Sequence, residues 1–563
     1  MVQDVLVCLS LIIVLAAILT IIARAIKQPP IISYLLTGII AGPLFLNLIG
    51  ADSSALIQVF AHIGVAFLLF IIGLSLDLRL LKEVGKVSTL AGFTKIIITG
   101  VIGFLIAVGI GMSNTTALYL GAALAFSSTV VVVKILSDKK EIDTLHGRLA
   151  LGILIVEDFV AAIALMAIPL MSRSTEIFSI LIEIGLAVLL IGAVFLLSRF
   201  LFPRFLNYLA RSQEALFLFG IAWALILAAA FSKLGFSLEI GALIAGMSLA
   251  SSKYTLDLGG KMKPLRDFFI ILFFVFFGSQ LASPVSWGLI KTALLFSLFV
   301  IIGKPIIVMS ILRIFGYKKR TNFLAGSSIA QVSEFSLIII LLGFTLGHLT
   351  QEIMSLTVLI AVITIGVSSY SIHYSSWIFN KLSRFLVIFE GKRYRKETKK
   401  QQDYDIILFG YHRIGYKILR TLKKMRRSFV VVDYNPKVVL ALGKEGINCI
   451  FGDAADKEFL NELNLGKAKL IISTIPDENS NLTIQEKLQQ EESNAIFIAT
   501  AEHSRDALEL YSKGADFVIV PQHLGGNYVS SMLSSFLLDK KKYESEGKKH
   551  FQEILDGKKN SIY

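Results

Sequence analysis

The sequence has little charge and almost no cysteine for its length. Of its 563 residues, 17% are charged and 55% are hydrophobic, and the mean hydropathy is +0.72. Soluble globular proteins carry about 25% charged residues, so this balance excludes a chain that is soluble throughout and indicates one dominated by bilayer-spanning segments. The two cysteines, Cys8 and Cys449, lie far apart. No disulfide framework is indicated, and a reducing compartment suits the part outside the membrane.

Several functional patterns are also missing. The sequence contains no catalytic Ser/His/Asp pattern and no Cys/His cluster with metal-ligand spacing, so it predicts neither an enzyme nor a bound metal other than a monovalent cation. No motif like the TVGYG filter of potassium channels is visible. The net charge of +14 comes mostly from lysines in loops and in the tail. Membrane topology requires basic loops, so nucleic-acid binding is not predicted.

Apolar runs near 20 residues long fill the sequence up to about residue 378, and each is long enough to cross a bilayer as a helix. With alternate loops assigned to opposite sides, one side receives nineteen lysines and arginines and the other only Arg173, Lys233 and Lys291. The positive-inside rule then predicts a protein of the cell membrane whose amino terminus lies outside the cell and whose carboxyl-terminal part lies in the cytoplasm. The thirteen predicted spans are residues 5–23, 31–49, 55–76, 88–111, 116–136, 149–171, 177–198, 213–232, 236–250, 267–282, 289–312, 322–345 and 353–377.

Short matches recur in the same order at nearly one spacing, which indicates a duplicated unit. The two units begin at the second and ninth spans, an odd number of crossings apart, so the second copy would enter the membrane from the opposite side. Such inverted repeats are typical of transporters. Each match alone would also suit ordinary helix packing through small residues. The matches are "TGIIAG" (37–42) with "GALIAG" (241–246), placing Gly42 and Gly246 204 positions apart; Gly73 with Gly278, 205 apart; and "AFSS" (125–128) with "AGSS" (325–328), 200 apart.

Ionisable residues interrupt the apolar spans. Glu157 and Asp158 lie near the middle of span 149–171, and Lys304 lies in span 289–312. Such groups are costly inside a bilayer and usually face a cavity or one another. Adjacent residues of a helix point about 100° apart, so we expect Asp158 to line an ion pathway and Glu157 to pair with Lys304. The alternative is a Glu157–Lys304 bridge that only holds the helices together.

Small polar residues interrupt two further spans, 116–136 and 322–345. Small hydroxyl side chains can cap freed backbone groups, so a helix can break inside a membrane if the break lines water. Two broken helices, one from each repeat, would offer half-helix ends that help bind a cation or balance buried charge. The alternative is an unbroken helix whose serines bond the preceding turn. The interrupting residues are Ser127, Ser128 and Thr129 in the first span and Ser327, Ser328, Gln331, Ser333 and Glu334 in the second.

Four motifs of the membrane part point to a known family: "YLLTGIIAGP" (34–43), "FLLFIIGLSLD" (67–77), "LAFSSTVVVVKIL" (124–136) and "GILIVEDFVA" (152–161). In them this part, roughly residues 1–378, resembles the monovalent cation:proton antiporters of the Kef type. The resemblance implies alternating access in which Asp158 holds either a proton or a cation, never both, and no enzymatic activity. We expect Glu157, Ser128 and Thr129 to complete the ion and proton site.

One departure leaves the cation open. The Kef proteins have Gln-Asp where this chain has Glu157-Asp158. A second acid resembles the electrogenic sodium/proton exchangers of the same superfamily, in which a lysine like Lys304 pairs with the first acid. K+/H+ exchange is the favoured prediction and Na+/H+ exchange the alternative within the superfamily. From other classes, the alternatives are a nucleotide-gated potassium channel and an oxidoreductase.

After the spans, the sequence predicts a charged linker over 379–402, an α/β lobe over 403–521 and a basic, partly helical tail over 522–563. The linker "EGKRYRKETKKQQ" (390–402) would lie close to anionic lipid headgroups. The predicted fold is thus an α-helical polytopic membrane protein with an inverted repeat and two discontinuous helices, followed by a C-terminal Rossmann-like domain.

The lobe begins as a strand, a helix and a second strand, with glycines where a dinucleotide fingerprint belongs and an acid where the ribose would bind. His412 replaces the middle glycine, so a single-phosphate nucleotide such as AMP fits more easily than NAD(H). The lobe resembles regulator-of-potassium-conductance domains, marked by "GDA" (452–454), which implies nucleotide control and a homodimer. The alternative is a lobe that only dimerises. The predicted nucleotide-binding residues are Gly410, His412, Arg413, Gly415, Asp433 and Asp453.

Overall fold

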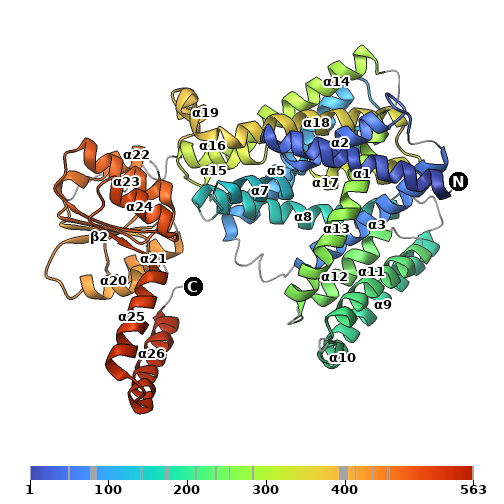
Figure 1. Cartoon of the computed structure of the whole chain (residues 1–563). Helices are drawn as coiled ribbons and strands as arrows, with labels where there is room; N and C mark the ends of the chain where they lie inside the picture. The colour runs from blue at the N-terminus through green and yellow to red at the C-terminus, as the bar shows by residue number, and fades with distance from the viewer. Residues whose placement is uncertain are drawn as a thin grey trace. The chain divides into compact units, whose positions relative to one another are not determined.

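The computed structural model divides the chain into two compact units, Met1–Gly391 and Lys392–Tyr563, each described here by itself. Figure 1 shows a helical first unit and a second unit that contains a sheet. The structure describes residues 2–48, 51–75, 85–139, 141–142, 144–171, 177–209, 212–234, 238–250, 252, 254–281, 285–391, 403–411, 414–433, 436–452, 454–455 and 457–560.

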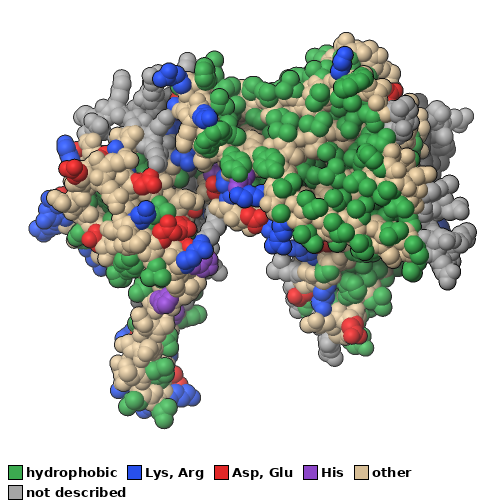
Figure 2. Space-filling model, turned by 45° about the horizontal axis from the view of Figure 1, so that its top comes forward, with side chains coloured by type: hydrophobic (Ala, Val, Ile, Leu, Met, Phe, Trp, Pro, Cys, Tyr) green, Lys and Arg blue, Asp and Glu red, His purple; other side chains and the backbone are tan. Residues whose placement is uncertain are grey.

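Helices occupy every predicted apolar segment of the first unit. By length and composition, six helical segments in the described residues suffice to cross a membrane, so the count of thirteen crossings stays a prediction. Hydrophobic side chains spread over the face of this unit seen in Figure 2, as a lipid-facing surface requires. The helices are α1 (Val2–Ala25), α2 (Pro30–Ala41), α3 (Ala51–Ser75), α5 (Gly85–Gly109), α6 (Asn114–Ala125), α7 (Thr129–Asp138), α8 (Leu145–Met171), α9 (Ile177–Phe200), α10 (Phe202–Leu209), α11 (Gln213–Lys233), α12 (Leu238–Leu249), α13 (Thr255–Ser279), α14 (Trp287–Leu298), α15 (Lys304–Ile314), α16 (Lys319–Ser328), α17 (Glu334–Thr345), α18 (Gln351–His373) and α19 (Ser375–Leu382). A π-helical turn, η1 (Phe299–Gly303), joins α14 to α15, and a 3-10 turn, η2 (Phe385–Phe389), follows α19.

The repeated glycines lie where helices of the two repeats cross. Gly38 of α2 packs on Gly278 of α13, and Gly73 of α3 packs on Gly246 of α12, each so closely that a Cβ would overlap a backbone carbonyl oxygen of the other helix. The pair α2–α13 and the pair α3–α12 are therefore counterparts, exchanged by the repeat. The reciprocal contacts agree with the predicted inverted repeat, but they make Gly38 rather than Gly42 the counterpart of Gly246. Close crossings of this kind require small residues.

The two discontinuous helices are also confirmed. Residues 126–128 separate α6 from α7, and residues 329–333 separate α16 from α17. Ser128 caps α7 by accepting the amide hydrogen bond of Val131, and Ser333 caps α17 in a capping box.

The structure corrects the register of the repeat at these breaks. The positions of Ser128 and Ser333 differ by 205, the offset that also relates Gly73 to Gly278. Ser328, the predicted counterpart of Ser128, is instead the last residue of α16 and donates its hydroxyl to the Leu324 carbonyl, 2.8 Å away. The "AFSS" and "AGSS" match therefore paired Ser128 with a serine five residues too early, although the observed break at 329–333 lies within the predicted interruption of residues 327–334.

Part of the predicted linker folds against the first unit. Phe379 of α19 and Leu386 of η2 pack with Phe323 and Leu324 of α16 in one small apolar cluster. Residues 379–391 therefore belong to this unit, which ends at Gly391.

The second unit is a doubly wound α/β fold, as predicted. Its six strands are all parallel in the order β3-β2-β1-β4-β5-β6, so the winding direction changes between β1 and β4. The strands are β1 (Ile406–Phe409), β2 (Phe429–Asp433), β3 (Cys449–Phe451), β4 (Leu470–Ser473), β5 (Ile496–Thr500) and β6 (Phe517–Ile519). The helices are α20 (Gly415–Leu422), α21 (Pro436–Lys444), α22 (Lys457–Glu462), α23 (Glu478–Gln490), α24 (Ser504–Ser512), α25 (Pro521–Phe536) and α26 (Lys540–Asn560), with a 3-10 turn, η4 (Leu465–Lys467), before β4.

The close contact between α2 and α13 predicts that a larger side chain at position 38 destabilises the protein. Gly38→Ala places a methyl group against the Val275 carbonyl, and overpacking of this kind costs about 1–3 kcal/mol. We expect a lower melting temperature for the purified protein in detergent, measured by intrinsic fluorescence. Gly192→Ala, whose methyl group meets no atom within 4 Å, is the control. Equal melting temperatures for the two variants would contradict the close crossing.

Candidate functional site

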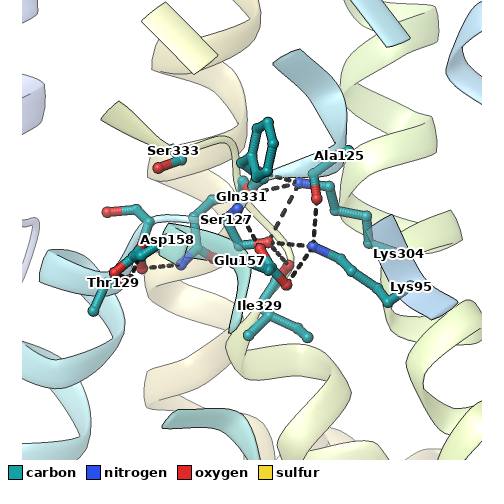
Figure 3. Close-up of polar contacts among 12 residues, drawn as sticks. Lys95, Ala125, Ser127, Thr129, Glu157, Asp158, Lys304, Ile329, Gln331 and Ser333 are labelled. Atoms are coloured by element: carbon teal, nitrogen blue, oxygen red, sulfur yellow. Dashed lines mark hydrogen bonds and ion pairs between the residues drawn. The ribbon is translucent and has the colours of Figure 1, made fainter. Parts of the chain in front are cut away.

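The candidate ion site lies where the two discontinuous helices meet, next to α5, α8 and α15 (Figure 3). The carboxyl ends of α6 and α16 bring unpaired carbonyl groups to this point, and the amino ends of α7 and α17 bring unpaired amides. The first kind of end carries partial negative charge and the second partial positive charge. Cationic side chains are therefore favoured at the carboxyl ends of α6 and α16, and carboxylates at the amino ends of α7 and α17. We call the place where the breaks of α6–α7 and α16–α17 meet the crossing.

Both carboxylate oxygens of Glu157 on α8 accept hydrogen bonds from inside the protein. Its Oε1 is 2.7 Å from the ammonium nitrogen of Lys95 on α5, and its Oε2 accepts the backbone N–H of Ser127 at 2.8 Å. Both charged side chains have 0% exposure. The prediction that Glu157 pairs with Lys304 is wrong, because Lys95 takes that position.

Lys304, the first residue of α15, binds backbone oxygens of both breaks. Its Nζ donates to the Phe126 carbonyl at 2.7 Å and to the Gln331 carbonyl at 2.8 Å. Ser127 Oγ lies 3.4 Å away. No carboxylate of the described residues forms an ion pair with Lys304. Lys304 thus neutralises the exposed carbonyl ends rather than a carboxylate.

Asp158 points away from this cluster (Figure 3). Thr129 Oγ1 lies 3.1 Å from Asp158 Oδ1 and 2.9 Å from Oδ2. Thr129 is the first residue of α7, so Asp158 lies at a positive helix end. The Asp158 side chain is partly exposed, whereas that of its neighbour Glu157 is fully buried.

Glu334, the first residue of α17, is a further carboxylate at the crossing. Ser128 Oγ donates to its Oε1 at 2.7 Å, and Ser333 Oγ lies 3.3 Å from its Oε2. Thr129 and Glu334 differ by 205 positions, so both carboxylate contacts occur at equivalent helix starts of the two repeats. The crossing therefore places Asp158 and Glu334 where helix dipoles stabilise negative charge.

Gln331 contributes an acceptor without a donor. Its Nε2 lies 3.3 Å from the Ser128 carbonyl and 3.4 Å from the Ser328 carbonyl, while its fully buried Oε1 has no hydrogen-bond partner among the described residues. A buried amide oxygen of this kind suits a water molecule or a monovalent cation.

Sequence reasoning missed Lys95. It lies inside the run "GFTKIIITG" (92–100), in the span predicted over 88–111. The signal was present, because a lysine in the middle of an apolar span needs a partner as much as an acid does. Its three hydrogen-bond partners come from three other segments of the chain, which no local pattern indicates.

In the second unit, the predicted nucleotide loop follows β1 at the point where the winding direction changes. Gly410 has φ +85°, which favours glycine, and a Cβ at Gly415 would overlap the Gly410 carbonyl. The loop therefore leaves room for close approach to the start of α20, as a phosphate needs. His412, Arg413 and Asp453 lie outside the described residues.

Asp433 ends β2 beside this loop. Its Oδ2 accepts the backbone N–H of Tyr411 at 2.9 Å, so the carboxylate holds the start of the loop. Burial, together with the nearby charge of Asp433, raises the pKa of the Cys449 thiol on β3 to about 12. Cys449 is therefore protonated at neutral pH and unsuited to redox chemistry. The residues present fit a nucleotide at the carboxyl edge of β1 and β2.

Comparison with known proteins agrees with this geometry. Residues 11–375 match the family model "Sodium/hydrogen exchanger, transmembrane", and residues 406–521 match the TrkA-N domain. The chain is 29% identical to "Putative cation/proton antiporter YbaL" of Escherichia coli (strain K12) over 90% of this chain and 93% of the relative.

Two further relatives are similar in sequence to this chain. Identity to "K(+) efflux antiporter 5" of Arabidopsis thaliana is 31% over 59% of this chain and 60% of the relative. Identity to "Glutathione-regulated potassium-efflux system protein KefC" of Escherichia coli O81 (strain ED1a) is 28% over 89% of this chain and 80% of the relative. The matching family consists of transporters, so the enzyme and channel alternatives are not supported. The chain belongs to the sodium/hydrogen exchanger family, as a Kef-type cation/proton antiporter with a C-terminal TrkA-N domain.

Proposed function

We propose that this antiporter exchanges K+ for H+ by alternating access and that Asp158 is the group that holds either ion. The observation that carries the proposal is the contrast between two adjacent acids. Glu157 is buried with both oxygens bonded, whereas Asp158 is partly exposed and bonds only the Thr129 hydroxyl among the described residues. Asp158 is therefore the acid that can exchange partners with solvent.

The surroundings of Asp158 can replace part of a cation's hydration shell. A monovalent cation needs several oxygen ligands, and the crossing offers the Asp158 carboxylate, the Thr129 hydroxyl and, from the second break, the Glu334 carboxylate and Gln331 Oε1. Proton binding to Asp158 removes the charge that attracts the cation. Competition for one carboxylate thus couples the two fluxes.

The preference for K+ rests on the names of two relatives. One is named a K(+) efflux antiporter and another a potassium-efflux system protein. Their similarity to this chain supports K+ over Na+, and Na+ remains the alternative cation to test.

Neutralising Asp158 should abolish exchange. In inside-out vesicles with an internal pH dye, addition of K+ or Na+ should cause dequenching with the parent protein and none with Asp158→Asn at equal expression, because the variant lacks the carboxyl group that exchanges the proton for the cation. Asp138→Asn changes an exposed acid on α7 and is the matched control. Cation-driven proton flux by Asp158→Asn would overturn the site, and a larger response to Na+ than to K+ would overturn the selectivity.

We also propose that a nucleotide bound at the TrkA-N domain regulates transport, AMP more readily than NAD(H), with Asp433 binding the ribose. The last residues of the first unit, up to Gly391, contact the start of α16. Asn322 Nδ2 donates to the carbonyls of Tyr317 and Phe389, each 2.9 Å away, and the N–H of Gly391 donates to the Tyr317 carbonyl at 3.1 Å. A pull on residue 391 therefore acts directly on α16, which ends at the ion site.

Nucleotide binding should be detectable without transport. AMP, NAD and NADH, added separately to the purified protein, should raise its melting temperature, AMP most, and Asp433→Ala should remove the shift. Asp403→Ala, an exposed acid before β1, should retain it. The ratio of exchange with nucleotide to exchange without it should fall toward one in Asn322→Ala. If no nucleotide raises the melting temperature, or if Asp433→Ala shows the same shifts, the proposal of nucleotide regulation is wrong and the lobe serves only in dimerisation.

The orientation follows from the charge of the loops: the amino terminus lies outside and the TrkA-N domain in the cytoplasm of the cell membrane. The nucleotide should then act from the bath in inside-out vesicles and have no effect from the bath in right-side-out vesicles. The opposite sidedness would reverse the orientation.

The proposed assembly is a homodimer whose subunits meet through α25, the helix that follows the TrkA-N domain. Helix α25 has no buried residue, and it exposes Leu524, Val529 and Leu533 by 43%, 53% and 57%. A helix with such a surface needs a cover, and a second copy of the same helix supplies one of matching chemistry.

Charging this surface should separate the subunits. We expect the parent protein in detergent to have the mass of a dimer by light scattering and the double variant Val529→Glu/Leu533→Glu to have the mass of a monomer, because the charges oppose burial. Leu508→Glu, at an isolated site that is 70% exposed, should stay dimeric. A dimeric double variant would show that other surfaces hold the subunits together.

A further inference from the structure

Two adjacent acids in one span suggest that two protons could move per cycle, but the structure separates them. We propose that Lys95 is a positioning residue that withdraws Glu157 from the transport cycle, so that one H+ exchanges for one cation and no net charge moves. The inference rests on the proposed role of Asp158 and adds the stoichiometry and the residue that sets it.

The ammonium group of Lys95 has all three of its hydrogens engaged. It donates to the Ala125 carbonyl at 2.7 Å, to Ser127 Oγ at 2.9 Å and to Glu157 Oε1 at 2.7 Å. Lys95 has 0% exposure. These contacts hold the ammonium at the carboxyl end of α6, where the helix dipole also favours a cation.

Each carboxylate oxygen of Glu157 already accepts a hydrogen bond from the protein. With Oε1 on Lys95 and Oε2 on the Ser127 amide, protonation would break a charge-assisted bond and leave Lys95 as an unpaired buried cation, which is strongly unfavourable. Asp158 has neither constraint, since its described partner is a neutral hydroxyl. Only one of the two acids can therefore exchange a proton for a cation.

The charges of the crossing give the same count. Counted in their ionised forms, Lys95 and Lys304 contribute two positive charges and Glu157, Asp158 and Glu334 three negative ones, so the formal sum is one negative charge. One H+ or one monovalent cation makes the crossing neutral, and a neutral site is the favourable one to carry through a medium of low dielectric constant. The charge of Arg266 in α13 also acts on Glu334, but Arg266 pairs with Asp267 at 2.7 Å, so this pair adds no net charge to the count.

The lysines also occupy related places in the repeat. The offset of 205 carries Lys95 to position 300 in η1, four residues and about one helical turn before Lys304. Each lysine donates to carbonyls at a helix break: Lys95 to Ala125 in the first, and Lys304 to Phe126 and Gln331 across both. Both lysines therefore belong to the framework that holds the two breaks together.

The test uses the full-length protein in proteoliposomes with a pH dye inside and a voltage-sensitive oxonol dye outside. A K+ pulse should change the internal pH without an oxonol signal beyond that of liposomes carrying Asp158→Asn, and K+ and H+ fluxes should be equal. A protein-dependent oxonol signal, or two H+ per K+, would overturn the proposal. Exchange by Asp158→Asn would instead defeat the proposed function on which it rests.

Variants test the role of Lys95. Lys95→Met frees Glu157 to take up a proton, so the H+ to K+ ratio should rise above one and exchange should generate a voltage. The double variant Lys95→Met/Glu157→Gln should restore the ratio of one with measurable exchange, because the pair is replaced by neutral groups of similar size. The control pair is Lys134→Met/Asp138→Asn, an exposed bridge, which should leave the ratio unchanged.

These variants also separate positioning from simple stapling. A staple would alter melting temperature but not stoichiometry, so Lys95→Met with a ratio of one would overturn the proposal. If Lys95→Met does not fold, the double variant decides. A folded double variant without exchange would show that Glu157 itself carries an ion.

Discussion

The free carbonyl groups left by two interrupted helices are the constraint on which the ion site depends. Inside a membrane these groups need partners, and Lys95 and Lys304 supply them at Ala125, Phe126 and Gln331. Two buried ammonium groups in turn need negative charge nearby. Glu157 pairs directly with Lys95, and Asp158 and Glu334, at the amino ends of α7 and α17, supply the remaining negative charge. The free backbone carbonyls thus account for the buried lysines, and the lysines account for the acids that form the antiporter site.

The rigid framework and the exchanging group are separate in this arrangement. Close glycine contacts hold α2 against α13 and α3 against α12, while the crossing of α6–α7 with α16–α17 carries the charges. Asp158 reaches away from the lysines toward Thr129. The fixed charges can therefore persist through the cycle while Asp158 alone changes its partner.

Much of this arrangement can be predicted from sequence, where the signal is local. Apolar runs locate the helices, Gly73 and Gly278 reveal the repeat, and the serines mark both breaks. Pairing across the crossing is not local. Glu157 faces both a lysine on α5 and a lysine on α15, and only packing shows that Lys95 takes the carboxylate. The counterpart of Ser128 was assigned to Ser328 instead of Ser333 because "AGSS" resembles "AFSS" more than the sequence around Ser333 does.

The central claim is that a single carboxylate, Asp158, exchanges one proton for one cation while Lys95 keeps Glu157 ionised. The most direct measurement is proton release on cation binding, made with a pH indicator in weakly buffered detergent solution near the midpoint of the competition. Saturating K+ should release at most one proton per chain from the parent protein and none from Asp158→Asn. Release of two protons per chain, or undiminished release from Asp158→Asn, would contradict the account.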